Sequence, residues 1–356
     1  MLVCSLRAGI GYPERIFMIG SKKRIIATVL FLAFVGAYLA LVLLPMPTNY
    51  PCDNPFLKGD GKPNIVAHRG GGGEFPQNTL EAFYNAYSID EDVIMETDVN
   101  LTKDGVLILL HNQLLDATTN VTGLASEWNY SDLIAQRVDF GYSNPTENTV
   151  LAGEREHFNI DGVNVYPTDV SYPEGVIPRD EEIFLATTFE ELLLAFPDNL
   201  ISVEIKQEGE LGIAAAKETR RLVEKYDAYD RVVFASFHTE VIKEFASWQR
   251  KKEVPESFMY APGIAGIVKY YALSHLGLNS LYTDSVVSLP LPTDEYGISL
   301  ATSRIVENAH KRNIAVMYWT INDEGEMREL IELGADGIMT DYPSRLKGVL
   351  DEYGAD

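Results

Sequence analysis

Cysteine is nearly absent from this sequence, and its scarcity excludes two kinds of site. Among the 356 residues there are two cysteines, Cys4 and Cys52, which lie on opposite sides of a long apolar run. They supply neither a disulfide framework within one domain nor the ligand set of a cysteine zinc site. No Ser or Cys occurs in a recognisable nucleophile motif, which argues against acyl transfer through a covalent intermediate.

Basic residues are also few. The chain has 29 Lys and Arg against 52 Asp and Glu, and a net charge of -23. The first 51 residues hold five basic residues and one acidic residue, so residues 52–356 carry 24 basic and 51 acidic side chains and a net charge of -27. Such a body repels nucleic acid and disfavours adsorption to an anionic membrane surface. Any phosphate that it binds must be held by a local cation, either a metal or Arg and Lys side chains.

No charged residue occurs between residues 25 and 51, and residues 25–44 are almost wholly apolar. About 20 apolar residues suffice for a helix that crosses a bilayer. Three consecutive basic residues, 22–24, directly precede the run. Because positive charge stays on the cytoplasmic side, this order predicts that the N-terminus is cytoplasmic.

We therefore expect a short cytoplasmic segment at 1–24, a transmembrane signal anchor at 25–46 and a periplasmic or extracellular domain at 52–350. The competing interpretation is a cleaved signal peptide that starts at Met18. The apolar run is long for a signal peptide, and residues 45–51 lack a small-x-small cleavage site. These two features favour the anchor.

Beyond the apolar run, short β-rich segments alternate with amphipathic helical patterns, and neither a repeat nor a low-complexity linker is evident. Repeated strand–helix units indicate a parallel sheet. Their number favours an α/β fold of the TIM type, a closed (β/α)8 barrel, over an open sheet. The candidate strands are residues 65–67, 93–99, 106–110, 200–205, 232–235, 258–260, 315–319 and 337–340.

Other segments define helices, a turn and an insertion. Asn78 or Thr79 is expected to cap one helix and Thr188 another. Residues 103–105 (Lys-Asp-Gly) form a turn, so the second and third candidate strands are not both expected in the barrel. Residues 112–185 are the least regular part, and we interpret them as an insertion near one mouth of the barrel.

Polar and charged residues, whose burial is unfavourable, directly follow several of these strands. In a barrel, side chains at the carboxyl ends of successive strands converge on one mouth, where barrel enzymes have their active sites. Carboxylates at positions i and i+2 of a strand also share one face. The residues in such places are His68, Arg69, Glu96, Asp98, His111, Glu204 and Lys206.

Three carboxylates brought to one mouth, those of Glu96, Asp98 and Glu204, repel one another unless a cation lies among them. Oxygen-only ligation suits a hard divalent ion such as Mg²⁺ or Ca²⁺, with Mn²⁺ as a further option. An extracytoplasmic location favours Ca²⁺.

The remaining polar residues suit phosphoryl transfer. His68 and His111 are suited to general acid and base catalysis, because the unperturbed imidazole pKa of about 6.5 allows both protonation states near neutrality. Arg69 offers a bidentate fork to a phosphate, and Lys206 offers a point charge.

Taken in order, these motifs resemble the glycerophosphodiester phosphodiesterase family. The resemblance spans residues 64 to about 348. It is carried by residues 68–70 (His-Arg-Gly), 76–83 (Pro-Gln-Asn-Thr-Leu-Glu-Ala-Phe), 94–99 (Ile-Met-Glu-Thr-Asp-Val), 102–105 (Thr-Lys-Asp-Gly), His111, 203–206 (Val-Glu-Ile-Lys), 235–237 (Ala-Ser-Phe), 318–323 (Tyr-Trp-Thr-Ile-Asn-Asp) and 334–343 (Gly-Ala-Asp-Gly-Ile-Met-Thr-Asp-Tyr-Pro).

The resemblance implies a TIM-type barrel and a divalent cation, Ca²⁺ or Mg²⁺, on the metal positions Glu96, Asp98 and Glu204. It implies that a glycerol hydroxyl attacks phosphorus and expels the alcohol, and that water then opens the cyclic phosphate to give glycerol 3-phosphate. The catalytic acid and base would be His68 and His111. Phosphate and substrate would be bound by Arg69, Lys206 and Trp319, the last of which would line the mouth unless it lies in the barrel core.

Two departures from the family pattern concern neighbours of these residues. Asn112 stands where the family usually has an aspartate after the second histidine, and an amide cannot stabilise an imidazolium electrostatically. Gln77 stands where the family more often has a glutamate. The first departure bears on reaction rate rather than on metal binding.

The expected substrate is a small phosphodiester of the glycerophosphocholine or glycerophosphoethanolamine type. A lipid-directed relative, a lysophospholipase D, is the alternative among enzymes and would need an apolar rim around the mouth. A non-catalytic, membrane-tethered binding protein on the same barrel is the alternative of another class, supported only by Asn112. Aromatic residues that would supply the rim are Trp128, Tyr130, Phe140, Tyr142, Phe158, Tyr166 and Tyr172.

Overall fold

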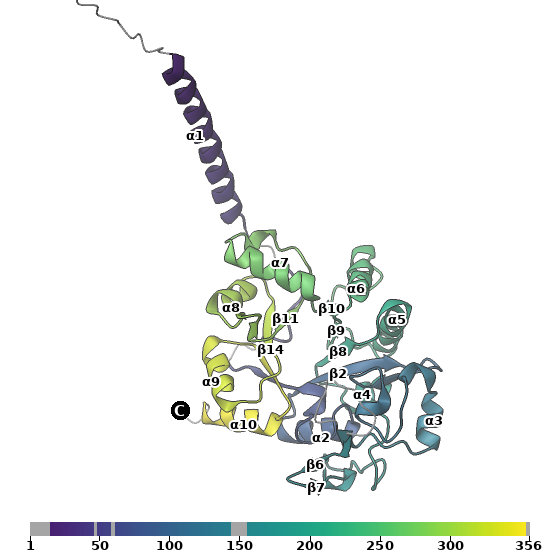
Figure 1. The fold of residues 1–356 in the computed structure, drawn as a ribbon. Coiled ribbons are helices and arrows are strands. Elements are labelled where there is room, and N and C mark those ends of the chain that lie inside the picture. The colour runs from purple at the N-terminus through teal and green to yellow at the C-terminus, as the bar shows by residue number, and fades with distance from the viewer. Residues whose placement is uncertain (1–14, 46–47, 58–60, 144–154, 354–356) are drawn as a thin grey trace, which may run out of the picture.

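The computed structural model describes residues 15–45, 48–57, 61–143 and 155–353. Figure 1 shows a long N-terminal helix, α1 (Arg15–Val42), that leads into a barrel of strands surrounded by helices. The barrel contains eight parallel strands in the order β10-β9-β8-β2-β1-β15-β14-β11. Their bounds are β1 Asn64–Ala67, β2 Ile94–Leu101, β8 Ile201–Ile205, β9 Val232–Ala235, β10 Met259–Tyr260, β11 Ser288–Leu291, β14 Ala315–Tyr318 and β15 Gly337–Thr340.

The first and last strands of the barrel are neighbours. β1 pairs with β15 in a parallel ladder that matches Asn64 with Gly337. β10 and β11 lie at the two ends of the strand order, and the amide of Val287 donates to the carbonyl of Tyr260 at 3.2 Å across this seam. The barrel is therefore nearly closed, and the predicted TIM-type fold is confirmed.

Alternate strand residues divide between two apolar cores, as the two-residue period of a strand requires. Ile65 and Ala67 belong to the large core between strands and helices. Val66 packs instead with apolar residues of the other barrel strands, and Tyr50 and Phe56 from the segment before β1 join that cluster. Side chains thus fill the barrel interior and leave its carboxyl-end mouth for the site.

Helices alternate with the barrel strands, and the two predicted caps are confirmed. The hydroxyl of Thr79 accepts from the amide of Ala82. Thr188 and Glu191 satisfy each other's amides in a capping box. The helices are α2 Leu80–Ile89, α4 Phe189–Ala195, α5 Gly209–Lys225, α6 Thr239–Lys251, α7 Ile264–His275, α8 Ser303–His310, α9 Glu324–Leu333 and α10 Pro343–Glu352, with short 3₁₀ turns η1 His68–Gly70 and η5 Asn279–Leu281.

The positions of two strands, β3 and β11, bear on the strand predictions from the sequence. β3 (Leu107–Leu109) pairs antiparallel with β2 and lies outside the barrel, which confirms that the turn at 103–105 separates a barrel strand from a hairpin strand. β11 is a barrel strand that the sequence pattern misses, because Pro290 lies within it. Proline is tolerated there because β11 is the last strand of the ladder order.

Between β3 and α4 the chain leaves the barrel and forms a lobe with its own apolar core. Phe140 and Phe158 are buried in this core, and Trp128, Tyr130 and Tyr172 pack against it. The regular elements of the lobe are α3 Tyr130–Ala135, β4 Tyr142–Ser143, β5 Glu156–His157, β6 Asn159–Ile160, β7 Val163–Asn164 and the 3₁₀ turns η2 Leu115–Ala117, η3 Ala125–Glu127 and η4 Pro167–Asp169.

The N-terminal helix contains an unburied apolar stretch, Lys22–Val42, of 21 residues. Its length and composition meet the requirements of a bilayer span and equally those of a signal sequence. The stretch meets the barrel near η5. The hydroxyl of Tyr38 donates to the carbonyl of Leu276 at 2.6 Å, and the hydroxyl of Ser280 donates to the carbonyl of Leu41 at 3.0 Å.

Candidate active site

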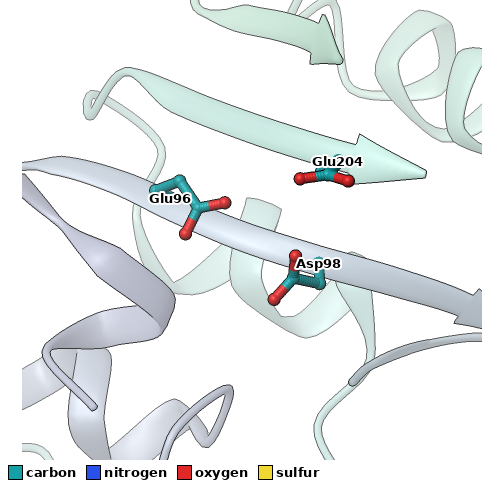
Figure 2. A group of neighbouring side chains, drawn as sticks. All are labelled: Glu96, Asp98 and Glu204. Atoms are coloured by element: carbon teal, nitrogen blue, oxygen red, sulfur yellow. The ribbon is translucent and has the colours of Figure 1, made fainter. Parts of the chain in front are cut away.

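Three carboxylates lie together at the carboxyl ends of two adjacent strands. Glu96 and Asp98 are two residues apart on β2, and the β2–β8 register places Asp98 beside Glu204. Figure 2 shows the three side chains directed into one region between the strands. One carboxylate oxygen from each residue lies within 4.8 Å of the others.

The electrostatics of this cluster fit a bound cation. Burial, followed by the charge of Asp98, raises the pKa of Glu96 to about 7. Burial also raises the pKa of Glu204. Carboxylates that oppose one another's ionisation in this way need a compensating positive charge. The donor set consists of oxygen atoms alone, and it therefore fits a hard divalent ion such as Mg²⁺ or Ca²⁺.

Two basic side chains flank the carboxylates. The ammonium of Lys206 lies 2.9 Å from Glu204 and 3.5 Å from Asp98, and Nε of Arg69 lies 3.4 Å from Asp98. Burial opposes ionisation of Asp98, but Lys206 and Arg69 outweigh it and hold the pKa of Asp98 at about 2. Asp98 is thus anionic across the physiological range and is the fixed negative charge of the cluster.

A sharp turn at the end of β1 positions the first histidine and Arg69. Arg69 and Gly70 both adopt positive φ, 55° and 84°, and a Cβ atom at Gly70 would lie 3.0 Å from the Cβ of Ala82 on α2. Glycine is therefore required where η1 meets α2. The turn directs the backbone amide of Arg69 to Glu96 at 2.9 Å and its guanidinium to the amide oxygen of Gln77 at 2.7 Å.

His68 has a carboxylate partner. Its Nδ1 lies 2.7 Å from Oδ1 of Asp341, and Oδ2 of Asp341 accepts from the side-chain amide of Asn322 at 2.7 Å. Burial lowers the pKa of His68, but the Asp341 hydrogen bond and the charge of Glu96 outweigh it, and the net shift is upward. The surroundings of His68 therefore favour its protonated form.

His111 has a neutral partner instead. It follows β3, and its Nδ1 lies 3.1 Å from the side-chain oxygen of Asn112. Burial is the largest influence and lowers the pKa of His111 to about 4, although Asp98 opposes the shift. His111 is thus neutral at pH 7, and the pKa values of the two imidazoles are shifted in opposite directions.

One cavity of about 290 Å³ brings these groups together. Its wall on one side is apolar and includes Phe237, Pro262 and Ile267. The indole of Trp319 completes this wall, with its ring centroid 6.1 Å from that of Phe237. Every site residue named from the sequence lines the cavity: His68, Arg69, Glu96, Asp98, His111, Glu204, Lys206 and Trp319.

The expected aromatic rim does not come from the insertion. All seven aromatic residues proposed for it lie in the part of the chain that the structure describes, and none of them lines the cavity. Phe140 and Phe158 are buried in the core of the lobe. The idea was wrong because five of the seven side chains pack in or against the core of the lobe, whereas the apolar wall comes from residues after β9, β10 and β14.

Sequence reasoning missed two residues that hold the site in place. Asp341 follows β15 in the same strand-then-charge pattern that identified Glu204, so the signal was present. Asn78 donates to Asp98 at 3.0 Å and accepts from the hydroxyl of Thr97 at 2.8 Å, which fixes the end of β2 against the start of α2. Asn78 lies in a loop, and hydrophobic periodicity does not predict which loop side chains face a site.

Known proteins resemble this chain in sequence and in fold. Residues 68–345 match the model of the Glycerophosphoryl diester phosphodiesterase family. A glycerophosphodiester phosphodiesterase of Bacillus altitudinis is 25% identical over 292 residues, which cover 81% of this chain and 98% of that protein. A human lysophospholipase D, GDPD3, is 25% identical over 312 residues, covering 82% of this chain and 86% of that protein.

Solved structures share the fold. The glycerophosphoryl diester phosphodiesterase domain of a Mycobacterium tuberculosis protein superposes with a TM-score of 0.60 at 18% identity, over 81% of this chain and 98% of that one. An Oleispira antarctica phosphodiesterase, solved with the product sn-glycerol-3-phosphate, gives a TM-score of 0.56 at 19% identity, over 82% and 97%. With the family model covering most of the chain, this protein belongs to the glycerophosphoryl diester phosphodiesterase family and is a phosphodiesterase.

Proposed function

We propose that the protein hydrolyses glycerophosphodiesters to glycerol 3-phosphate and an alcohol with the help of a divalent cation. The observation that carries the proposal is the shared cavity. It combines a buried oxygen cluster, two histidines with different partners and two cationic side chains. These are the components that phosphoryl transfer requires, namely charge stabilisation and positioned proton transfer.

Glu96, Asp98 and Glu204 would hold the cation. When bound, it supplies Lewis-acid stabilisation of the negative charge that develops on oxygen during the reaction. Family members generally depend on a divalent metal, and the oxygen cluster of this chain meets that requirement. An extracytoplasmic site favours Ca²⁺ over Mg²⁺.

The two histidines divide the proton transfers. In the first step the glycerol hydroxyl next to the phosphate bonds to phosphorus, His111 takes its proton, and the bond to the leaving alcohol breaks as His68 protonates that oxygen. In the second step water opens the cyclic phosphate. His68 then accepts a proton from the water, and His111 returns its proton to the glycerol oxygen. The Asp341 hydrogen bond favours the protonated form of His68, and burial favours the neutral form of His111.

Arg69 and Lys206 bind the phosphate. Both lie at the cavity beside carboxylates, so they offset the negative field of a domain with a net charge of -27. The neighbouring apolar wall, with Phe237 and Trp319, covers the part of the substrate that carries no charge. A lysophospholipid is the second candidate substrate, because lysophospholipases D are among the relatives and this wall is apolar.

We assign α1 the role of an uncleaved membrane anchor. The basic residues 22–24 stay in the cytoplasm and the catalytic domain faces the periplasm or the cell exterior. A protein with a cleaved N-terminus after secretion would contradict this assignment, and mass spectrometry of the mature protein distinguishes the two outcomes.

The test of the reaction uses the full chain in detergent with glycerophosphocholine, glycerophosphoethanolamine and a lysophosphatidylcholine as separate substrates. EDTA is added first, and then Ca²⁺ or Mg²⁺ is returned in excess. The expected result is glycerol 3-phosphate that appears only with one of the ions. Lysophosphatidic acid and choline from the lysophospholipid alone would move the assignment to the lipid-directed activity. Turnover that persists unchanged in EDTA would refute the metal-dependent reaction.

A further inference from the structure

An exposed apolar stripe runs along α7. Ile264, Val268 and Leu276 are 58%, 60% and 56% exposed, and Ala272 between them is also exposed. Their spacing of four places Ile264, Val268 and Ala272 in one row along the helix, and Leu276, its C-cap, continues the row. We call these four residues the α7 stripe. A helix that covers a barrel normally turns such a face inward and leaves its polar face to solvent. The outward direction of this stripe therefore indicates a partner.

One end of the α7 stripe touches the apolar helix. The hydrogen bond from Tyr38 ends on the carbonyl of Leu276, and the bond from Ser280 ends on the carbonyl of Leu41. Both α1 residues belong to the apolar stretch Lys22–Val42 and lie within its last five positions. An anchor that spans a bilayer therefore brings the corner between α7 and η5 to the depth at which the acyl chains begin.

The other end of α7 borders the active site. Ile267 and Pro262, at the start of the helix, line the apolar wall of the cavity. The 12 residues of α7 extend for about 18 Å at the rise of an α-helix. Figure 1 shows α7 between α1 and the barrel strands. The stripe thus connects the anchor to the rim of the catalytic cavity.

The charge of the domain narrows the choice of partner. Residues 52–356 carry a net charge of -27, which opposes an anionic surface, and Lys269 on α7 is already paired with Asp284 at 2.8 Å. Attraction between α7 and the partner must therefore come from apolar burial rather than from charge. The interface of a bilayer rich in zwitterionic lipid provides this, and α1 holds the stripe there.

We propose that the α7 stripe lies in the bilayer interface beside α1 and presents lysophospholipids to the catalytic cavity. This inference rests on the proposed phosphodiesterase function and on the proposed anchor. A cavity of about 290 Å³ is at the lower end of ligand sites, so it holds the glycerol phosphodiester group but not a long acyl chain. The acyl chain stays in the membrane and leaves along α7.

The first test measures depth in the membrane and does not depend on catalysis. Val268→Cys is made with Cys4→Ser and Cys52→Ser, labelled with an environment-sensitive fluorophore and reconstituted as the full chain in phosphatidylcholine vesicles. Val163→Cys on β7 is the matched control, because this valine is 69% exposed and lies on the lobe. Lipids with brominated acyl chains should quench the label at position 268 and leave that at position 163 unquenched.

Two results of this labelling experiment would overturn the proposal. Equal quenching by aqueous iodide at both positions would overturn the proposal, because the stripe would then face water. An apolar emission spectrum at position 268 without quenching by brominated lipid would overturn it too, since it would identify a protein partner such as a second copy of the chain.

The second test separates the lipid surface from the chemistry. In phosphatidylcholine vesicles, Val268→Glu should lower kcat/KM for lysophosphatidylcholine about five-fold, as expected for a charge moved into the interface. Val163→Glu should not, and turnover of glycerophosphocholine should be unchanged in both variants. An equal effect of the two variants on the lysophospholipid would refute delivery along α7. If the unaltered chain turns over neither substrate, the proposed function fails, while the quenching result still decides the membrane contact.

Discussion

Asp341 and His68 lie 2.7 Å apart, although 272 residues separate them in the sequence. They meet because β15 and β1, the last and first barrel strands, are neighbours in the sheet and both end at the same mouth. The hydrogen bond lowers the pKa of Asp341 despite its burial, so the carboxylate is ionised. His68 thus has an anionic partner, whereas His111 has the neutral amide of Asn112.

Replacement of Asp341 by Asn should move the alkaline limb of the pH–rate profile to lower pH. Burial and Arg69 both lower the pKa of His68, and without the carboxylate they act with less opposition. As the catalytic acid, His68 must be protonated, so activity is lost as the pH rises through its pKa. We expect kcat/KM at pH 7 to fall about ten-fold or more, with Asp341→Glu retaining the alkaline limb. An unmoved limb in Asp341→Asn would contradict the pairing of roles.

Replacement of Asn112 by Asp should move the acidic limb to higher pH. His111, whose pKa is held at about 4, must be neutral to act as the base, so activity is lost as the pH falls through that value. A carboxylate beside Nδ1 raises the pKa of the imidazole and strengthens it as a base. Steady-state profiles of kcat/KM should show the shifted limb and a several-fold faster reaction near neutrality. A slower enzyme with an unchanged limb would show that His111 is not the base.

Replacement of Glu204 by Gln should abolish metal binding and metal-dependent turnover. In the unaltered protein, an ion at about 100 times its Kd should raise the free energy of unfolding by about 2.7 kcal/mol. The variant should show no such increase when denaturation is followed with and without Ca²⁺ or Mg²⁺. Glu208→Gln, four residues away on an exposed side chain, is the control and should respond like the unaltered protein. Stabilisation of the Glu204→Gln protein by the same ion would place the metal elsewhere.

Replacement of Arg179 by Ala should destabilise the junction between the lobe and the barrel. Arg179 bonds to Glu81 on α2 at 3.0 Å, and Glu81 is only 2% exposed, so the variant leaves a buried carboxylate without its partner. Loss of one member of a buried pair costs about 3–5 kcal/mol. Arg137→Ala is the matched control, because the side chain of Arg137 is 54% exposed where it pairs with Asp180, and a pair open to solvent contributes less than about 1 kcal/mol. Chemical denaturation that gives equal losses for the two variants would refute this account.

Charged residues that directly follow a strand identified the cavity, because their position in the sequence shows at which end of the barrel their side chains lie. This pattern named Glu96, Asp98 and Glu204, and all three meet at one mouth. The local sequence pattern does not show which of these side chains bond to each other across the mouth. The role of Asp341 depends on the closure of the barrel between β1 and β15, which only the folded chain establishes.

The lobe and the apolar wall show the same limit. Composition marks residues 112–185 as irregular, but it does not say that Phe140 and Phe158 belong to a separate core. The sequence likewise does not show which side of α7 is exposed, because that depends on which side packs against the barrel. The alternative of a non-catalytic binding protein is set aside by membership of a phosphodiesterase family. The order of the motifs thus establishes the family, whereas the residues that contact the substrate can be identified only from the packing of the folded chain.

The ladder between β2 and β8 joins Met95 to Ile201, which are 106 positions apart. At ribosomal rates of about 5–20 residues per second, the edge of β2 waits roughly 5–20 s for its barrel partner to be synthesised. An unpaired strand edge is a template for association with another chain. Glu96 and Asp98 place like charges within the waiting segment, and like charges directly opposite each other destabilise strand pairing. The two carboxylates on this edge therefore disfavour its pairing with the same segment of another chain before β8 is made.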